Sequence, residues 1–166
     1  MKFVADGMLG KLTRWLRMLG YDVKYSNDFD DAHLLSLVKK EKRILLTRDF
    51  ELYRQTIAKG FEAFYVERQT KEDTLALLAE RFDIKLGIDM ANSRCPKCNT
   101  KIKPIPKEDV KDNIEQNTLM HYNDFWICPK CKQIYWQGSH WTKIRKSLKM
   151  AKETFQNLQR SERHNT

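Results

Sequence analysis

Two Cys-x-x-Cys pairs have the most specific spacing for metal chemistry in this chain. The pairs are Cys95 with Cys98 and Cys128 with Cys131, and they include all 4 cysteines. Four thiolates complete the tetrahedral coordination of a zinc ion and leave no open position, so the predicted zinc is structural. A redox-active pair, an iron–sulfur centre and two disulfides are the alternatives, and each accounts less well for two matched pairs in a cytoplasmic chain.

Aspartates near the ends of predicted strands are the second candidates for chemistry. Asp6 and Asp49 each follow a short apolar stretch, and Asp30 and Asp31 precede a helical pattern. In a parallel α/β sheet such positions share one crevice, where these folds place their active sites. Clustered carboxylates bind Mg²⁺ or Mn²⁺, which can activate water for phosphodiester hydrolysis. We predict all four as catalytic, with Asp6, Asp31 and Asp49 as metal ligands; helix N-capping is the alternative role.

Positive charge is concentrated in the second half of the chain. The net charge is +9; residues 1–90 hold 16 basic and 15 acidic side chains, and residues 91–166 hold 15 basic and 7 acidic. This asymmetry favours a densely negative partner such as RNA, and a solvated lysine-rich surface is the alternative. The residues predicted to contact RNA are Lys11, Arg14, Arg17, Arg48, His140, Trp141, Lys143, Arg145 and Lys146.

Three of these assignments have specific alternatives. Arg17 fits a solvated helix face equally well, and His140 fits a helix cap. Trp141 belongs to a group of aromatic residues around the cysteine pairs, which either stack RNA bases or pack this segment against the first half of the chain. The other members of the group are Tyr122, Phe125, Trp126, Tyr135 and Trp136.

The elements that must position these residues follow from hydrophobic periodicity. Short apolar stretches at 2–5, 21–25, 44–47 and 63–66 predict strands, and amphipathic patterns between and after them predict helices. Strands that alternate with helices indicate an α/β fold with a parallel sheet covered on both faces. Residues 139–166 predict a basic amphipathic helix that docks on the body, seats a protein partner or lies along RNA.

These patterns divide the chain into three expected parts. They are an α/β domain at 1–90, a four-cysteine zinc ribbon at 91–138 and a C-terminal helix at 139–166. Apolar stretches are too short to cross a membrane, and Asp6 interrupts any signal-like stretch at the N-terminus. We therefore expect a cytoplasmic protein without a membrane-spanning segment.

Several motifs together resemble the mut-seven C-terminal RNase domain family. The motifs occur in order at residues 6–22, at Asp30-Asp31, at 43–49, in the two Cys-Pro-x-Cys knuckles and at 135–141. The resemblance covers residues 1 to about 145 and implies a PIN-like nuclease domain fused to a zinc ribbon. It also implies a metal-dependent ribonuclease whose acidic set falls on Asp6, Asp30 or Asp31, and Asp49. PIN nucleases commonly carry a fourth acid, for which Glu51 and, less well placed, Glu67 are the candidates.

Three functional hypotheses follow. The first is an Mg²⁺- or Mn²⁺-dependent endoribonuclease whose zinc ribbon and C-terminal helix bind RNA. The second is an RNA-binding or ribosome-associated protein, with tRNA or rRNA as ligand and little or no turnover. The third and weakest is a zinc-ribbon adaptor that binds a protein through its C-terminal helix.

Overall fold

Four parallel strands form the central sheet of the protein. The computed structural model describes residues 1–164, and its sheet has the order β2-β1-β3-β4. The strands are β1 (Lys2–Ala5), β2 (Asp22–Tyr25), β3 (Ile44–Thr47) and β4 (Ala63–Tyr65). Phe3 lies opposite Val23 on one side and opposite Ile44 on the other, so β1 is central. The α/β fold class predicted from the sequence is confirmed.

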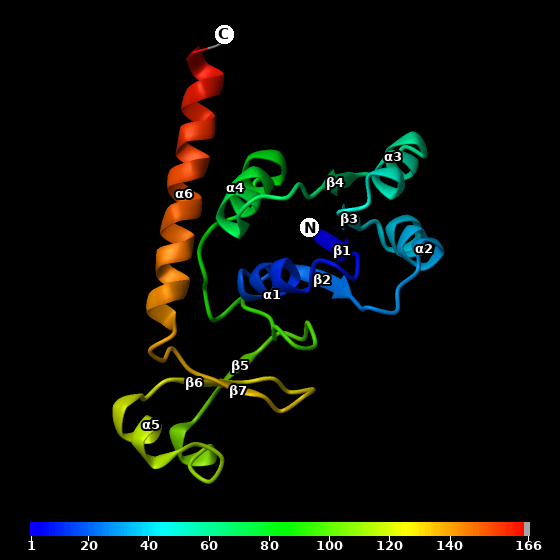
Figure 1. The fold of residues 1–166 in the computed structure, drawn as a ribbon. Helices are drawn as coiled ribbons and strands as arrows, with labels where there is room; N and C mark the ends of the chain where they lie inside the picture. Colours follow the sequence, from blue (N-terminus) through cyan, green and yellow to red (C-terminus); the bar gives the residue numbers. More distant parts are fainter. Residues whose placement is uncertain (165–166) are drawn as a thin grey trace.

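Helices cover both faces of this sheet (Figure 1). Helices α1 (Gly10–Met18) and α4 (Lys71–Phe82) pack on one face, and α2 (Asp31–Glu41) and α3 (Phe50–Ala58) pack on the other. Successive side chains of β1 point to opposite faces, so Phe3 and Ala5 join the first core and Val4 joins the second. All three are fully buried, which explains why the strands are apolar on both faces.

The strand order places a topological switch point between β1 and β3. The chain leaves β1 for β2 on one side and returns to pair β3 on the other side. In open parallel sheets the crevice outside the carboxyl ends of such a strand pair is the usual ligand position. Asp6 directly follows β1, and Arg48 and Asp49 directly follow β3.

The cysteine-containing segment forms a second, antiparallel sheet in the order β5-β6-β7. Its elements are β5 (Lys103–Ile105), the 3₁₀ helix η1 (Lys107–Asp109), α5 (Gln116–His121), β6 (Phe125–Ile127) and β7 (Ile134–Tyr135). Phe125 is buried against Val110 and Leu119, which form a small core of their own. Phe125 therefore belongs to the core of this cysteine-containing segment, and its side chain is not accessible to a ligand.

The C-terminal helix α6 (Trp141–His164) runs beside α4 (Figure 1). Its 24 residues span about 36 Å. Leu148 and Ala151 are buried in the same core as Leu75 of α4. The apolar stripe of this helix thus docks on the α/β body. In the part of the chain that the structure describes, no helix has both the length and the hydropathy to cross a membrane.

Candidate metal centre and cationic cleft

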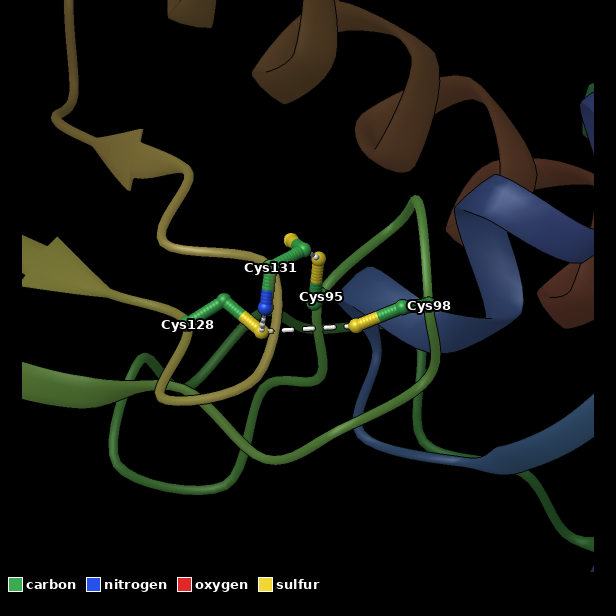
Figure 2. Close-up of side chains that lie close together, drawn as sticks. All are labelled: Cys95, Cys98, Cys128 and Cys131. Atoms are coloured by element: carbon green, nitrogen blue, oxygen red, sulfur yellow. Dashed lines mark hydrogen bonds between the residues drawn. The ribbon is translucent and has the colours of Figure 1, made fainter.

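The four cysteines converge from two loops to form a candidate metal centre (Figure 2). Their sulfur atoms all lie within 4.8 Å of one another. The Sγ atoms of Cys95 and Cys131 are 3.5 Å apart, and those of Cys98 and Cys128 are 3.3 Å apart. Zinc–sulfur bonds of about 2.3 Å in a tetrahedron separate the sulfurs by about 3.8 Å. The cluster is therefore close to the size that a zinc ion requires, and it could hold such a metal.

The two cysteine loops have the same backbone geometry. Asn99 N donates to Cys95 O at 2.9 Å, and Lys132 N donates to Cys128 O at the same distance. Asn99 and Lys132 both have left-handed backbones, with φ of 69° and 61°. Each loop can therefore present its two thiols to one side, because the left-handed residue turns the chain back directly after the second cysteine.

Tyr135 supports this centre from β7. Its hydroxyl lies 3.0 Å from the Sγ of Cys95. Burial and the nearby Cys95 sulfur raise the pKa of Tyr135, so the phenol stays protonated and can donate to the thiolate. Such a hydrogen bond orients a metal ligand. The sequence placed Tyr135 only in a general group of aromatic residues, because no local pattern signals a contact across 40 positions.

Arg17 ties the first cysteine loop to the α/β domain. Its side chain lies at the carboxyl end of α1, and the residue is only 5% exposed. Nη2 donates to Val23 O at 2.8 Å and Nη1 donates to Pro96 O at 2.9 Å. Burial lowers the pKa of Arg17, and the thiols of Cys95 and Cys98 partly offset this effect. Arg17 thus has a structural role in place of the predicted RNA contact, because its guanidinium is enclosed by protein.

Asn99 makes a second connection, at the exposed edge of the parallel sheet. Its Oδ1 accepts from Val23 N at 3.0 Å, and its Nδ2 donates to Asp22 Oδ1 at 2.8 Å. Asp22 also forms an ion pair with Arg43 at 2.8 Å. Burial acts to raise the pKa of Asp22, but the hydrogen bonds from Arg43 and Asn99 outweigh it and the net shift is downward. The cysteine loop therefore covers the edge strand β2.

Asp6 joins the carboxyl ends of β1 and β3. The residue is 8% exposed. Its Oδ2 accepts from the Thr47 hydroxyl at 2.5 Å and from Arg48 N at 2.8 Å, and its Oδ1 accepts from Met8 N at 2.9 Å. Through these hydrogen bonds, the carboxylate fixes the position of the loop after β1 relative to the loop after β3 at the switch point.

The other predicted aspartates lie at helix N-termini. Asp30 accepts from His33 N at 2.7 Å and caps α2, and Asp49 accepts from Leu52 N at 3.0 Å and caps α3. Asp31 is exposed in the first turn of α2. The alternative that these residues cap helices therefore holds for Asp30 and Asp49.

The structure does not gather these aspartates into a metal-binding group. Among the residues that it describes, only the four cysteines form a group of three or more His, Cys, Asp or Glu side chains able to share one ion. Asp6, Asp31 and Asp49 form no such group. Their role as ligands of Mg²⁺ or Mn²⁺ stays a prediction, as does the role of Glu51 as fourth acid.

A cleft of about 640 Å³ opens beside the switch point and is lined by basic residues. Lys11 and Arg14 come from α1 and Arg48 from the end of β3, as the sequence predicted for residues flanking the crevice. Lys71, at the start of α4, completes the set and was missed. Among the described residues that line the cleft, none is acidic. Lys71 could not be found from the sequence, because it follows β1 by more than 60 residues.

The predicted contacts near the start of α6 divide into two kinds. Trp141 is 8% exposed, and its indole Nε1 donates to Trp136 O at 3.2 Å, so its side chain is largely buried and bonded to the cysteine-containing segment. His140, Lys143, Arg145 and Lys146 are exposed. The side chains of these four residues are accessible to a ligand, whereas the side chain of Trp141 is not.

A comparison with models of known protein families shows the family of this chain. A family model described as the Mut7-C RNAse domain matches residues 1–148 of the 166. This chain belongs to the Mut7-C RNase domain family. The Mut7-C match includes the parallel sheet, the four cysteines and the first residues of α6, consistent with a PIN-like domain followed by a zinc ribbon. No curated protein and no solved structure matches the chain. Membership of the Mut7-C family indicates a hydrolase that acts on RNA.

Proposed function

We propose that this protein is an Mg²⁺- or Mn²⁺-dependent endoribonuclease that cleaves RNA at the carboxyl ends of β1 and β3. The observation that carries the proposal is the basic cleft at the switch point of a chain that matches an RNase family model. Backbone phosphates are the groups by which proteins hold RNA regardless of sequence, and lysine and arginine neutralise them. The cleft therefore supports a phosphodiester substrate.

The proposed catalytic residues are Asp6, Asp30, Asp31 and Asp49, with Asp6, Asp31 and Asp49 as ligands of the catalytic metal. Asp31 and Asp49 are exposed and have carboxylate oxygens open to solvent, while Asp6 already accepts three hydrogen bonds. A bound Mg²⁺ or Mn²⁺ would supply an activated water and neutralise charge on the scissile phosphate. Because the three carboxylates do not form a preassembled group, phosphate oxygens of the substrate are needed to complete the coordination.

The remaining parts of the chain would hold the substrate. Lys11, Arg14 and Arg48 would bind phosphates in the cleft, and Asp6 would hold the loop that leads into α1 against the loop after β3. The zinc in the cysteine centre would be structural, since its four thiolates leave no open position. The exposed basic residues at the start of α6 would extend the RNA-binding surface.

An RNA-binding protein with little turnover is the second candidate function. It is favoured by one specific observation, namely that the described aspartates form no group that could share an ion. Both functions predict RNA binding that weakens as salt concentration rises. They differ in whether removal of a single carboxylate abolishes a metal-dependent cleavage.

The test is cleavage of total cellular RNA by the purified protein, with Mn²⁺ or with EDTA. The Asp49→Asn variant retains a good N-cap residue for α3, so its fold should be preserved. We expect cleavage with Mn²⁺, none with EDTA, and at least a hundredfold slower cleavage in the variant, on the order of the loss of one catalytic group. Asp28→Asn is the matched control, because Asp28 is exposed in the loop before α2 and has no predicted role.

Two results would decide against this assignment. Cleavage that persists unchanged in Asp49→Asn would remove Asp49 from the catalytic set. RNA binding without any Mn²⁺-dependent cleavage in the parent protein would favour the second function.

A further inference from the structure

We propose that the cleft beside the switch point recognises a terminal phosphomonoester of an RNA strand, together with the nucleotide that carries it. The proposal rests on the proposed function only for the identity of the ligand as RNA. It concerns recognition of a strand end, which neither cleavage of the backbone nor general affinity for RNA requires.

Three of the four cationic residues that line the cleft have no ion-pair partner among the described residues and can bind an anion. Lys11, Arg14 and Arg48 form no ion pair with any acidic residue of the described chain. All three are exposed; Lys11 and Arg14 lie on α1, and Arg48 directly follows β3. Three unpaired cations that face one cleft repel one another, and an anion bound between them relieves that repulsion.

Lys71, at the start of α4, is held beside the cleft by a set of contacts that reaches α6. Its Nζ lies 2.8 Å from Glu72 Oε1 and 5.2 Å from the centre of the Trp15 ring. Burial acts to raise the pKa of Glu72, but hydrogen bonds from Lys71 and from Ser147 of α6 outweigh it and the net shift is downward. An ionised Glu72 therefore fixes Lys71 at the rim of the cleft, so this cation needs little ordering when an anion binds.

The backbone at the start of α1 also favours an anion in this cleft. No side chain caps α1, and Gly10, Lys11 and Leu12 of its first turn line the cleft. The free amide groups of a first helical turn add to the attraction that the four cations exert. A Cβ atom at Gly10 would lie 2.8 Å from the Tyr25 hydroxyl, so glycine is needed for the close approach of Tyr25 to this loop.

The charge and the size of the cleft favour a strand end over an internal phosphate. A terminal phosphomonoester carries a charge of about −1.5 to −2 at neutral pH, whereas an internal phosphodiester carries a single charge. Three cations without an ion-pair partner in the described part of the chain, together with Lys71, which is shared with Glu72, match the higher charge. A volume of about 640 Å³ exceeds that of a phosphate and lies in the range of pockets for small organic ligands, so it also accommodates the attached nucleoside.

The experiment measures binding of short single-stranded RNA by fluorescence anisotropy, with three oligomers of one sequence. One carries a 5′-phosphate, one a 3′-phosphate and one has hydroxyls at both ends. EDTA and the Asp49→Asn background prevent cleavage, so the result does not depend on the proposed nuclease activity. We expect one phosphorylated oligomer to bind about tenfold more tightly than the hydroxyl oligomer, as charge-assisted contacts predict.

Substitutions of residues that line the cleft test whether the preference for the phosphorylated oligomer arises there. Arg48→Gln and Lys71→Gln should each lower the affinity for the phosphorylated oligomer more than the affinity for the hydroxyl oligomer, so that the preference for the phosphorylated end disappears. Lys59→Gln is the control, because Lys59 is an exposed lysine after α3 that does not line the cleft, and it should keep the preference. Equal affinity for all three oligomers would overturn the proposal. Binding of free AMP as tightly as the phosphorylated oligomer would overturn the assignment to an RNA end and indicate a free nucleotide instead.

Discussion

At the scale of single residues, the orientation on a helix decided the role of each basic residue of α1. Lys11, Arg14 and Arg17 are spaced by three, and the sequence predicted all three as RNA contacts, with a solvated helix face as the alternative for Arg17. Three residues advance a helix by about 300°, so each step turns the side chain by about 60° and Arg17 points about 120° away from Lys11. Lys11 and Arg14 consequently line the cleft, while Arg17 is buried beside Leu16 and contacts the cysteine loop.

Replacement of Arg17 by methionine should destabilise the protein by about 3 kcal/mol, because the carbonyls of Val23 and Pro96 lose a charged donor within a buried site. Urea denaturation of Arg17→Met measures this change. Arg14→Met is the matched control, since Arg14 is exposed, and its unfolding free energy should fall within about 0.5 kcal/mol of the parent. Equal midpoints for the two variants would show that the Arg17 contacts contribute nothing to stability.

At the scale of elements, the antiparallel segment is too small to fold by hydrophobic burial alone. Its strands β5, β6 and β7 have 3, 3 and 2 residues. A three-stranded sheet of this length has a marginal core, so a metal held by the four cysteines would supply part of its folding free energy. The turns at Asn99 and Lys132 shape the two cysteine loops, and such a metal would join them.

We expect one zinc ion per chain and a melting temperature that falls by about 10 °C or more when a strong chelator removes it, because binding free energy is coupled to folding. Metal analysis and thermal melting followed by circular dichroism test this expectation. Zinc, but not magnesium, should restore the melting temperature. Cys98→Ser should bind less zinc and melt near the chelated protein; full zinc content in that variant would contradict a four-cysteine site.

At the scale of the whole molecule, α6 and the α/β domain share one core. Leu148 and Ala151 of α6 are buried with residues of α1, α4 and the sheet. The family match ends at residue 148, yet the packing of α6 continues past it through Ala151 and Phe155. Two of the three expected parts, the α/β domain and the C-terminal helix, therefore share a core, whereas the segment 91–138 has small cores of its own. Arg17 and Asn99 connect that segment to the α/β domain, and we propose that the three parts unfold together.

Leu148→Ala should lower the unfolding free energy by about 2–4 kcal/mol through loss of buried contacts and formation of a cavity. A single cooperative transition is expected for the variant and for the parent, as measured by urea denaturation with both fluorescence and circular dichroism. Met150→Ala serves as the control on the opposite side of the helix, where Met150 is 46% exposed and its loss should change little. Two separate transitions in the parent would contradict a shared core.

Much of the fold was predictable because the sequence patterns that indicate it lie within short segments of the chain. Apolar stretches and helical periodicity within ten to twenty residues predicted the four strands of the parallel sheet and the helices that cover it. The four cysteines were equally evident, since ligand identity and spacing define the site. Asp30 and Asp49 as possible helix caps followed from their position before helical patterns.

The sequence by itself thus determined the elements of the α/β domain, the fold class and the four-cysteine candidate metal site, while the tertiary structure decided which side chains face one another. Arg17 is buried and bonds Pro96, Tyr135 contacts Cys95, and Lys71 lines the same cleft as Lys11, although none of these pairs is close in the chain. Local periodicity depends on neighbouring residues and can therefore be recognised in the sequence. A contact between distant residues depends on strand order and helix docking, and only the folded chain fixes those.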